Sequence, residues 1–337
     1  MTLNIEIVVL SILLIIFNQI CIKYNFFLDK VQNSSHKKFI VRKDLIPITG
    51  GLYLILGYLI IGQYIFNFIE IFFFLVIFLL GYLSDVLKSF LPVIRLFIQG
   101  LICLIFLFYF KVSISDVRIE IFNDLLEYNF ASYLFTLFCV LVLMNGSNFM
   151  DGVNLLSIGY FLMVLISIFL VSKNYDLETN IILVKELIVI LSFLLLMNSF
   201  NKVFLGDSGI YLLSFLIAII LIKFYNDNEF VSPYYIISLL WYPCFENLFS
   251  IIRKKLKNID PQRADNLHLH HLLYKKFYNI ESIKIRNNLT GLSIILFNIP
   301  IFLLSSFNYN HTKILVILIF FNVFFYLITY SYLKRSS

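Results

Sequence analysis

Eleven long apolar runs constrain the fold of this chain more than any other sequence feature. Each approaches the roughly 20 residues that a helix needs to cross a bilayer. The runs are rich in Ile, Leu and Phe, and they lack the alternation that marks an outer-membrane barrel. They lie near residues 3–22, 46–64, 66–84, 92–111, 130–147, 155–172, 182–198, 209–224, 232–251, 289–305 and 312–333. We therefore predict an all-α polytopic membrane protein with about 11 transmembrane helices.

The composition supports the same fold class. Of the 337 residues, 61% are hydrophobic and 14% are charged, whereas a soluble domain carries about 25% charged residues. No internal repeat or low-complexity linker divides the chain, so we expect one integral-membrane domain over residues 1–337. The cysteines have no metal-binding spacing, and we expect buried free thiols. They are Cys21, Cys103, Cys139 and Cys244.

The distribution of lysine and arginine predicts the orientation. Most of the 26 Lys and Arg residues fall on the side that holds residues 23–45, 85–91, 148–154, 199–208, 252–288 and the tail Lys334–Arg335. The positive-inside rule makes that side cytoplasmic and places the N-terminus outside. The net charge of +6 mostly reflects this asymmetry, so it indicates no nucleic-acid partner.

The motif NGSNFMDGVNLL, residues 145–156, separates two apolar runs and holds three Asn, one Asp and two Gly. An Asp at mid-membrane costs about 3 kcal/mol, so we predict a polar turn at the membrane surface. Asp151 and Asn154 would lie one helical turn apart on the same face. The turn has two interpretations: a site for a cation or a phosphate-bearing ligand, or an Asn/Gly helix cap between two spans.

An acidic residue followed by cations marks the end of the third run. Asp85 lies at the membrane edge, with Lys88 three residues later and Arg95 near the start of the next run. In one interpretation, the cations lie at the depth of a lipid phosphate and bind it. The alternative is a surface ion-pair group, which adds little to stability.

Asp207 lies between Gly206 and Gly209 and opens a predicted helix. A helix N-terminus offers free N–H groups and a positive dipole to an anion. A neighbouring carboxylate can recruit Mg²⁺, the usual partner of phosphate. The alternative is an N-cap with glycines for tight packing.

Three histidines, His268, His270 and His271, lie within four residues of the longest cytoplasmic loop. Zinc is one interpretation, although there is no HExxH and no nearby cysteine. The other is a cationic, hydrogen-bonding arm near phosphates, together with Arg263. The third interpretation is that these histidines lie on the surface of a helix and have no functional role.

All four motifs fall on the predicted cytoplasmic side. If they converge, the site combines carboxylates for Mg²⁺ with cations for phosphate at a membrane surface. This combination is typical of phosphoryl transfer between a soluble nucleotide compound and a lipid, which needs mainly positioning and charge neutralisation.

The same motifs, in the same order, resemble the polyprenyl-phosphate N-acetylhexosamine-1-phosphate transferase family. They are GYLSD at 81–85, NGSNFMDGVNLL at 145–156, FLGDSG at 204–209 and HLHH at 268–271. The HxHH form is similar to the GlcNAc-type branch rather than to the muramoyl-pentapeptide branch.

The resemblance implies transfer of a sugar 1-phosphate from a UDP-N-acetylamino sugar to undecaprenyl phosphate, with release of UMP. It implies a multi-pass protein of the bacterial inner membrane, with its active site on the cytoplasmic face, that starts a lipid-linked cell-surface glycan. A homodimer is also expected. The cofactor would be Mg²⁺, with Mn²⁺ as the alternative.

By motif position, the resemblance assigns catalytic roles to Asp85, Asp151 and Asp207, and metal binding to Asp207 and Asp151. The residues expected to bind substrate are Lys88, Arg95, Asn145, Asn148, Asn154, Arg263, His268, His270 and His271.

Two positions depart from the family pattern. The family has an Asp pair where this chain has Ser84-Asp85, and an Asp where it has Asn154. We expect an active enzyme, because a phosphate monoester is largely dianionic at neutral pH and needs no base. The competing hypotheses are a transporter or flippase, whose site would lie near the midplane, and a non-catalytic binder of lipid carriers.

Overall fold

The computed structural model describes residues 2–28, 46–62, 65, 67–87, 91–260 and 265–336. These residues form helices and no strand, apart from one antiparallel bridge between Leu28 and Pro47. The helices are α1 (Thr2–Tyr24), α2 (Gly50–Gly62), α3 (Phe68–Val86), α4 (Pro92–Phe110), α5 (Glu120–Leu126), α6 (Asn129–Met150), α7 (Leu156–Tyr175), α8 (Ile181–Ser199), α9 (Gly206–Asn226), α10 (Pro233–Leu256), α11 (Leu269–Lys276), α12 (Ile283–Phe307) and α13 (Thr312–Ser336).

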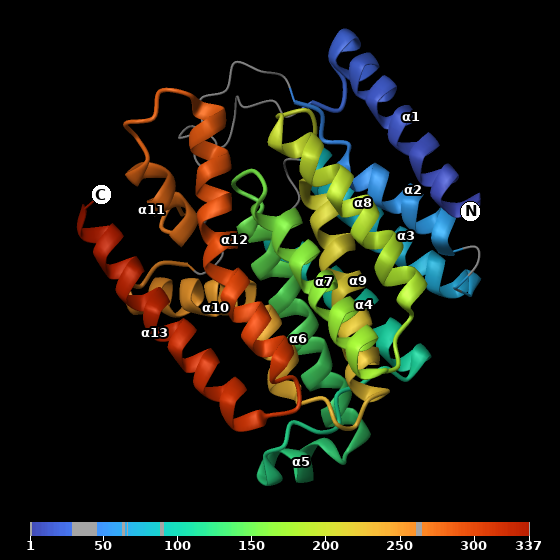
Figure 1. The fold of residues 1–337 in the computed structure, drawn as a ribbon, viewed down its shortest axis with the longest axis vertical. Coiled ribbons are helices and arrows are strands. Elements are labelled where there is room, and N and C mark those ends of the chain that lie inside the picture. The colour runs from blue at the N-terminus through green and yellow to red at the C-terminus, as the bar shows by residue number, and fades with distance from the viewer. Residues whose placement is uncertain are drawn as a thin grey trace.

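The predicted membrane fold is confirmed. Ten of the described helices are long and apolar enough to cross a membrane. The run at 46–64 forms α2, which has 13 residues and is about 20 Å long, shorter than a bilayer core. Two helices lie outside the predicted runs: α5 at the lower end of Figure 1, and α11 at its upper left.

Helix α9 forms the centre of the bundle (Figure 1), and most of its residues are buried. Its sequence is apolar on all sides, which is typical of a helix surrounded by other helices. By contrast, α4 and α13 expose broad apolar faces, as expected of helices that contact lipid. The polar residues that begin α9 therefore lie at the end of the most enclosed element of the fold.

Glycines allow α2 and α3 to contact the first turn of α9. A Cβ atom at Gly81 of α3 would collide with the backbone of Asp207 and Ser208. A Cβ atom at Gly51 of α2 would lie 2.6 Å from the backbone nitrogen of Gly209. This close packing brings the C-terminal end of α3, which carries the sequence Ser84-Asp85, against the N-terminus of α9.

The prediction of free thiols is confirmed for all four cysteines, and the prediction of burial holds for Cys21 and Cys103, whereas Cys139 and Cys244 are partly exposed. Helix α10 contains Pro243, and its C-terminal part runs toward α13 in Figure 1. Proline removes a helix hydrogen bond and bends the chain. The end of α10 contacts the residues that precede α11, because Arg253 donates hydrogen bonds to Leu267 O and to Asp265 Oδ2.

Candidate active site

The carboxylate of Asp85 caps the N-terminus of α9. Its Oδ1 accepts a hydrogen bond of 2.9 Å from the backbone N–H of Asp207, and its Oδ2 accepts one of 3.0 Å from that of Ser208. Gly206 has φ +73°, and a Cβ atom there would lie 2.9 Å from Asp85 Oδ2. A negative charge at a helix N-terminus satisfies free N–H groups and complements the dipole. Asp85 therefore fixes the backbone on either side of the Asp207 side chain.

Asp207 itself is held by a serine and an arginine. Its Oδ2 accepts hydrogen bonds from Ser84 Oγ at 2.5 Å and from Arg95 Nη1 at 3.0 Å. The same Arg95 nitrogen donates to Ser84 Oγ at 2.7 Å. The side chains of Arg95 and Asp207 are 22% and 27% exposed. The structure thus brings three of the predicted site residues, Asp85, Arg95 and Asp207, into one partly open cluster.

Tyr211, one helical turn beyond Asp207, connects this cluster to α6. The Arg95 guanidinium lies 5.9 Å from the centroid of the Tyr211 ring. The Tyr211 hydroxyl accepts a hydrogen bond of 3.3 Å from Asn148 Nδ2. Asn145, one turn earlier on α6, donates to its own helix at Leu141 O (2.9 Å). Of the two predicted asparagines in α6, Asn148 is therefore the one that is hydrogen-bonded to α9.

Asp151 follows the last residue of α6, and its Oδ1 accepts a hydrogen bond of 2.6 Å from Ser157. The next residue, Gly152, meets the histidine motif: a Cβ atom there would lie 2.7 Å from His270 Nε2. The motif that ends α6 thus contacts α9 through Asn148 and α11 through Gly152.

Asn154 is buried, and its polar groups contact other asparagines. Its Nδ2 donates to Asn201 Oδ1 at 2.5 Å and to Asn288 Oδ1 at 2.9 Å. Its Oδ1 accepts from Asn287 Nδ2 at 3.3 Å, and its backbone N–H donates to Asn287 Oδ1 at 3.0 Å. These bonds join the α6–α7 turn to the α8–α9 loop and to α12. Asn154 holds the turn in place, and its substrate contact stays a prediction.

The three histidines have different surroundings. His268 is buried, with Nδ1 2.9 Å from Glu246 Oε1 and Nε2 3.5 Å from Asp265 Oδ1. His270 is fully buried, and its ring centroid lies 4.2 Å from that of His271. Burial, with His271 and His268 nearby, holds the pKa of His270 well below its usual value. His270 is therefore neutral at physiological pH.

The carboxylates of Asp207 and Asp151 fit Mg²⁺ in their chemistry. Mg²⁺ prefers oxygen ligands and is usually held by one or two carboxylates together with substrate phosphates. Over the ranges that the structure describes, no three His, Cys, Asp or Glu groups are close enough to form a metal site by themselves. The zinc interpretation of the histidines therefore gains no support there. Phosphate oxygens would have to complete a magnesium site.

Two predicted residues, Lys88 and Arg263, lie outside the described residues. Sequence reasoning assigned no role to Tyr211 or Glu246. Glu246 carried a usable signal, because an ionisable residue inside an apolar span is a functional candidate by default. Tyr211 carried none, since an aromatic residue in an apolar helix is ordinary.

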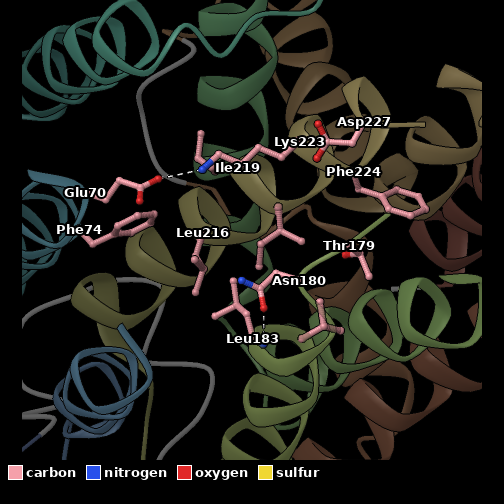
Figure 2. Close-up of a pocket in the computed structure, with 12 residues that line it drawn as sticks. Glu70, Phe74, Thr179, Asn180, Leu183, Leu216, Ile219, Lys223, Phe224 and Asp227 are labelled. Atoms are coloured by element: carbon pink, nitrogen blue, oxygen red, sulfur yellow. Dashed lines mark hydrogen bonds and ion pairs between the residues drawn. The ribbon is translucent and has the colours of Figure 1, made fainter. Parts of the chain in front are cut away.

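A cavity lies at the other end of α9, and Lys223 and Glu70 line it. Figure 2 shows these two side chains pointing toward one another, and Lys223 Nζ lies 2.8 Å from Glu70 Oε1. Its lining also includes Phe74, Asn180 and Asp227. Lys223 lies sixteen positions after Asp207 along α9, a distance of about 24 Å at 1.5 Å per residue. This cavity is therefore separate from the candidate active site.

Residues 67–225 match the family described as Glycosyl transferase family 4. A relative from Bacillus subtilis (strain 168), a probable undecaprenyl-phosphate N-acetylglucosaminyl 1-phosphate transferase, is 30% identical over 151 residues. That alignment covers 44% of this chain and 42% of the relative, less than half the length of each. The family match includes Asp85, Asp151 and Asp207 and ends before the histidines.

Proposed function

Because residues 67–225 of this chain match the glycosyl transferase family 4 model, we propose that the protein transfers an N-acetylamino-sugar 1-phosphate from a UDP-sugar to undecaprenyl phosphate. An oxygen of the lipid phosphate attacks the phosphorus that bears the sugar. The bond from that phosphorus to UMP breaks, and UMP leaves. The lipid then carries a diphosphate-linked sugar.

The observation that best supports this proposal is the cluster around Asp207. It places a partly open carboxylate, an arginine and a hydroxyl at the first turn of a buried helix. Phosphoryl transfer needs positioned charge more than covalent participation by the protein. Asp85 already occupies the N–H groups of Asp207 and Ser208. The substrate phosphates therefore meet Arg95 rather than the helix end.

The other site residues have distinct roles in this proposal. Asp207 and Asp151 would hold Mg²⁺, which when bound supplies charge neutralisation to the phosphates. His270 is neutral, so it contributes a hydrogen bond rather than a charge. Ser84 donates a hydrogen bond to Asp207 and does not act as a base. No base is needed, because the lipid phosphate is already largely dianionic at neutral pH.

The setting that we propose is the cytoplasmic face of a bacterial inner membrane. The excess of Lys and Arg on the side of the four motifs supports this orientation. The relative from Bacillus subtilis supports a bacterial membrane as the setting. The product would begin a lipid-linked cell-surface glycan, and the protein would act as a homodimer.

The test is release of UMP by purified protein from a panel of UDP-amino sugars, beginning with UDP-N-acetylglucosamine. Undecaprenyl phosphate is supplied in detergent, with and without Mg²⁺. We expect metal-dependent UMP from one donor and none from Asp207→Asn. Absence of UMP across the panel, from protein shown to be folded, would contradict the proposed reaction.

A further inference from the structure

Glu246 is a fully buried carboxylate in α10, and its two oxygens contact different parts of the chain. Oε1 lies 2.9 Å from Nδ1 of His268, and Oε2 accepts a hydrogen bond of 2.7 Å from the hydroxyl of Tyr326 in α13. A carboxylate inside a membrane span is costly unless it is paired. These two contacts therefore join α10, the start of α11 and α13 at one point.

His268 is fixed on its other sides as well. Its Nε2 lies 3.5 Å from Asp265 Oδ1, and its ring centroid lies 4.9 Å from that of Phe149 in α6. The other Asp265 oxygen accepts a hydrogen bond of 2.7 Å from Arg253. Burial raises the pKa of Asp265, but the charges of His268 and Arg253 and a backbone hydrogen bond outweigh burial and lower it. Both ring nitrogens of His268 thus face protein carboxylates.

His270, only two residues later, is in the opposite situation. It is fully buried, yet neither ring nitrogen has a hydrogen-bond partner among the described residues. Its Nε2 lies against Gly152, in the motif that ends α6. A buried polar group without a partner in the protein is a position where a ligand or water completes the bonding. One histidine is therefore held by the protein, and its neighbour is available.

We propose that Glu246, itself held by Tyr326, is a positioning residue that fixes His268 and thereby sets His270 and His271 against the nucleotide-sugar donor. In the histidine arm, residues 265–276, His268 is the N-cap residue of α11, so fixing that residue fixes the start of the helix. The inference rests on the proposed function for the identity of the donor. It extends the site to α10 and α13, outside the region that matches the family.

The kinetic test uses Glu246→Gln and Tyr326→Phe with UDP-N-acetylglucosamine as donor, or the panel sugar that the wild type accepts. Glu246→Gln replaces one carboxylate oxygen with an NH2 group and removes the negative charge that faces His268 and Tyr326, and Tyr326→Phe removes only the hydroxyl. We expect the KM for the donor to rise about tenfold, because a displaced arm weakens donor binding in ground and transition states alike. The kcat and the KM for undecaprenyl phosphate should stay within about twofold. Simple loss of folded enzyme would instead lower kcat and leave both KM values unchanged.

A second readout needs no substrate. His270 is buried in the wild type, so diethylpyrocarbonate should modify it slowly, as measured by mass spectrometry of the purified full-length protein. We expect modification at least about fivefold faster in Glu246→Gln and Tyr326→Phe, because local opening exposes the arm.

Two further variants serve as controls. Glu186→Gln alters another buried carboxylate, in α8, and should keep the wild-type KM and the wild-type protection of His270. His268→Asn places an amide nitrogen near the position of Nδ1 and should retain most of the donor affinity that His268→Ala loses.

Wild-type donor KM and wild-type protection in both Glu246→Gln and Tyr326→Phe would overturn the positioning role. If no donor yields UMP but the modification pattern appears as expected, the positioning of the arm is supported and the proposed reaction fails. The two inferences are therefore tested separately.

Discussion

At the scale of single residues, hydrogen bonds decide the function of each acidic group near α9. Asp85 and Asp207 are both short carboxylates close to the same helix start, yet their partners differ. Asp85 accepts from two backbone N–H groups, whereas Asp207 accepts from the side chains of Ser84 and Arg95. The first arrangement orients the backbone, and the second leaves a partly exposed carboxylate that a cation can approach.

We predict that Ser84→Ala lowers kcat/KM for UMP release about tenfold. The hydroxyl donates to a charged group, and such a hydrogen bond contributes about 1.5–3 kcal/mol, part of which Arg95 replaces. Ser84→Thr keeps the hydroxyl and should stay close to the wild type. Equal activity in Ser84→Ala and the wild type, over a range of Mg²⁺ concentrations, would contradict this role for Ser84.

His270 gives a pH prediction for stability. Its folded-state pKa is lowered, while the unfolded value is about 6.5. Below pH about 6.5 the unfolded state binds a proton that the folded state rejects, so stability falls as the pH decreases. We expect His270→Gln to reduce the loss of thermal stability between pH 7 and pH 5, measured in detergent. The same loss in both proteins would show that protonation of His270 does not contribute.

At the scale of helices, small residues determine where the functional side chains lie. Gly81 and Gly51 let α3 and α2 contact the first turn of α9, and Gly152 lets the end of α6 contact the histidine arm. Each glycine lies within a few residues of a polar motif. The positions of Ser84 and Asp85 relative to Asp207 therefore depend on the absence of a side chain at residue 81.

We predict that Gly81→Ala abolishes most UMP release and destabilises the protein by about 1–3 kcal/mol, the usual cost of overpacking. The added methyl group would push α3 away from Asp207 and Ser208. Gly100→Ala, in the neighbouring α4, is the matched control: its Cβ atom would lie 3.7 Å from Leu141, an ordinary contact. Similar effects of the two substitutions would exclude this packing argument.

At the scale of the whole molecule, the polar groups of the candidate site gather at one end of the bundle. The cavity with the Lys223–Glu70 pair lies at the other end. The Lys223 side chain is 42% exposed, so the pair adds little to stability. The two ends are joined by α9, whose length separates them by about 24 Å.

We therefore predict that Lys223→Met leaves kcat/KM for UMP release within about twofold of the wild type, because its charge is screened over that distance. Arg95→Met should lower it at least about a hundredfold, since it removes a charge aimed at the phosphates. Comparable losses of kcat/KM in the two variants, with equal amounts of folded protein, would contradict this prediction and show that the cavity contributes to the reaction.

The sequence by itself determined the membrane fold, its spans apart from the short α2, and the motif residues, because apolar length and clustered polar residues are local properties. It placed Asp207 at a helix start and Asp85 at a helix end, as the structure has them. The tertiary structure alone decided which groups meet. Asp85 caps α9 although the two segments are 122 positions apart, and Asn154 is hydrogen-bonded to residues up to 134 positions away. Glu246 contacts His268, 22 positions later, and Tyr326, 80 positions later. Such contacts depend on how helices pack, and no local pattern records the distance between side chains of different helices.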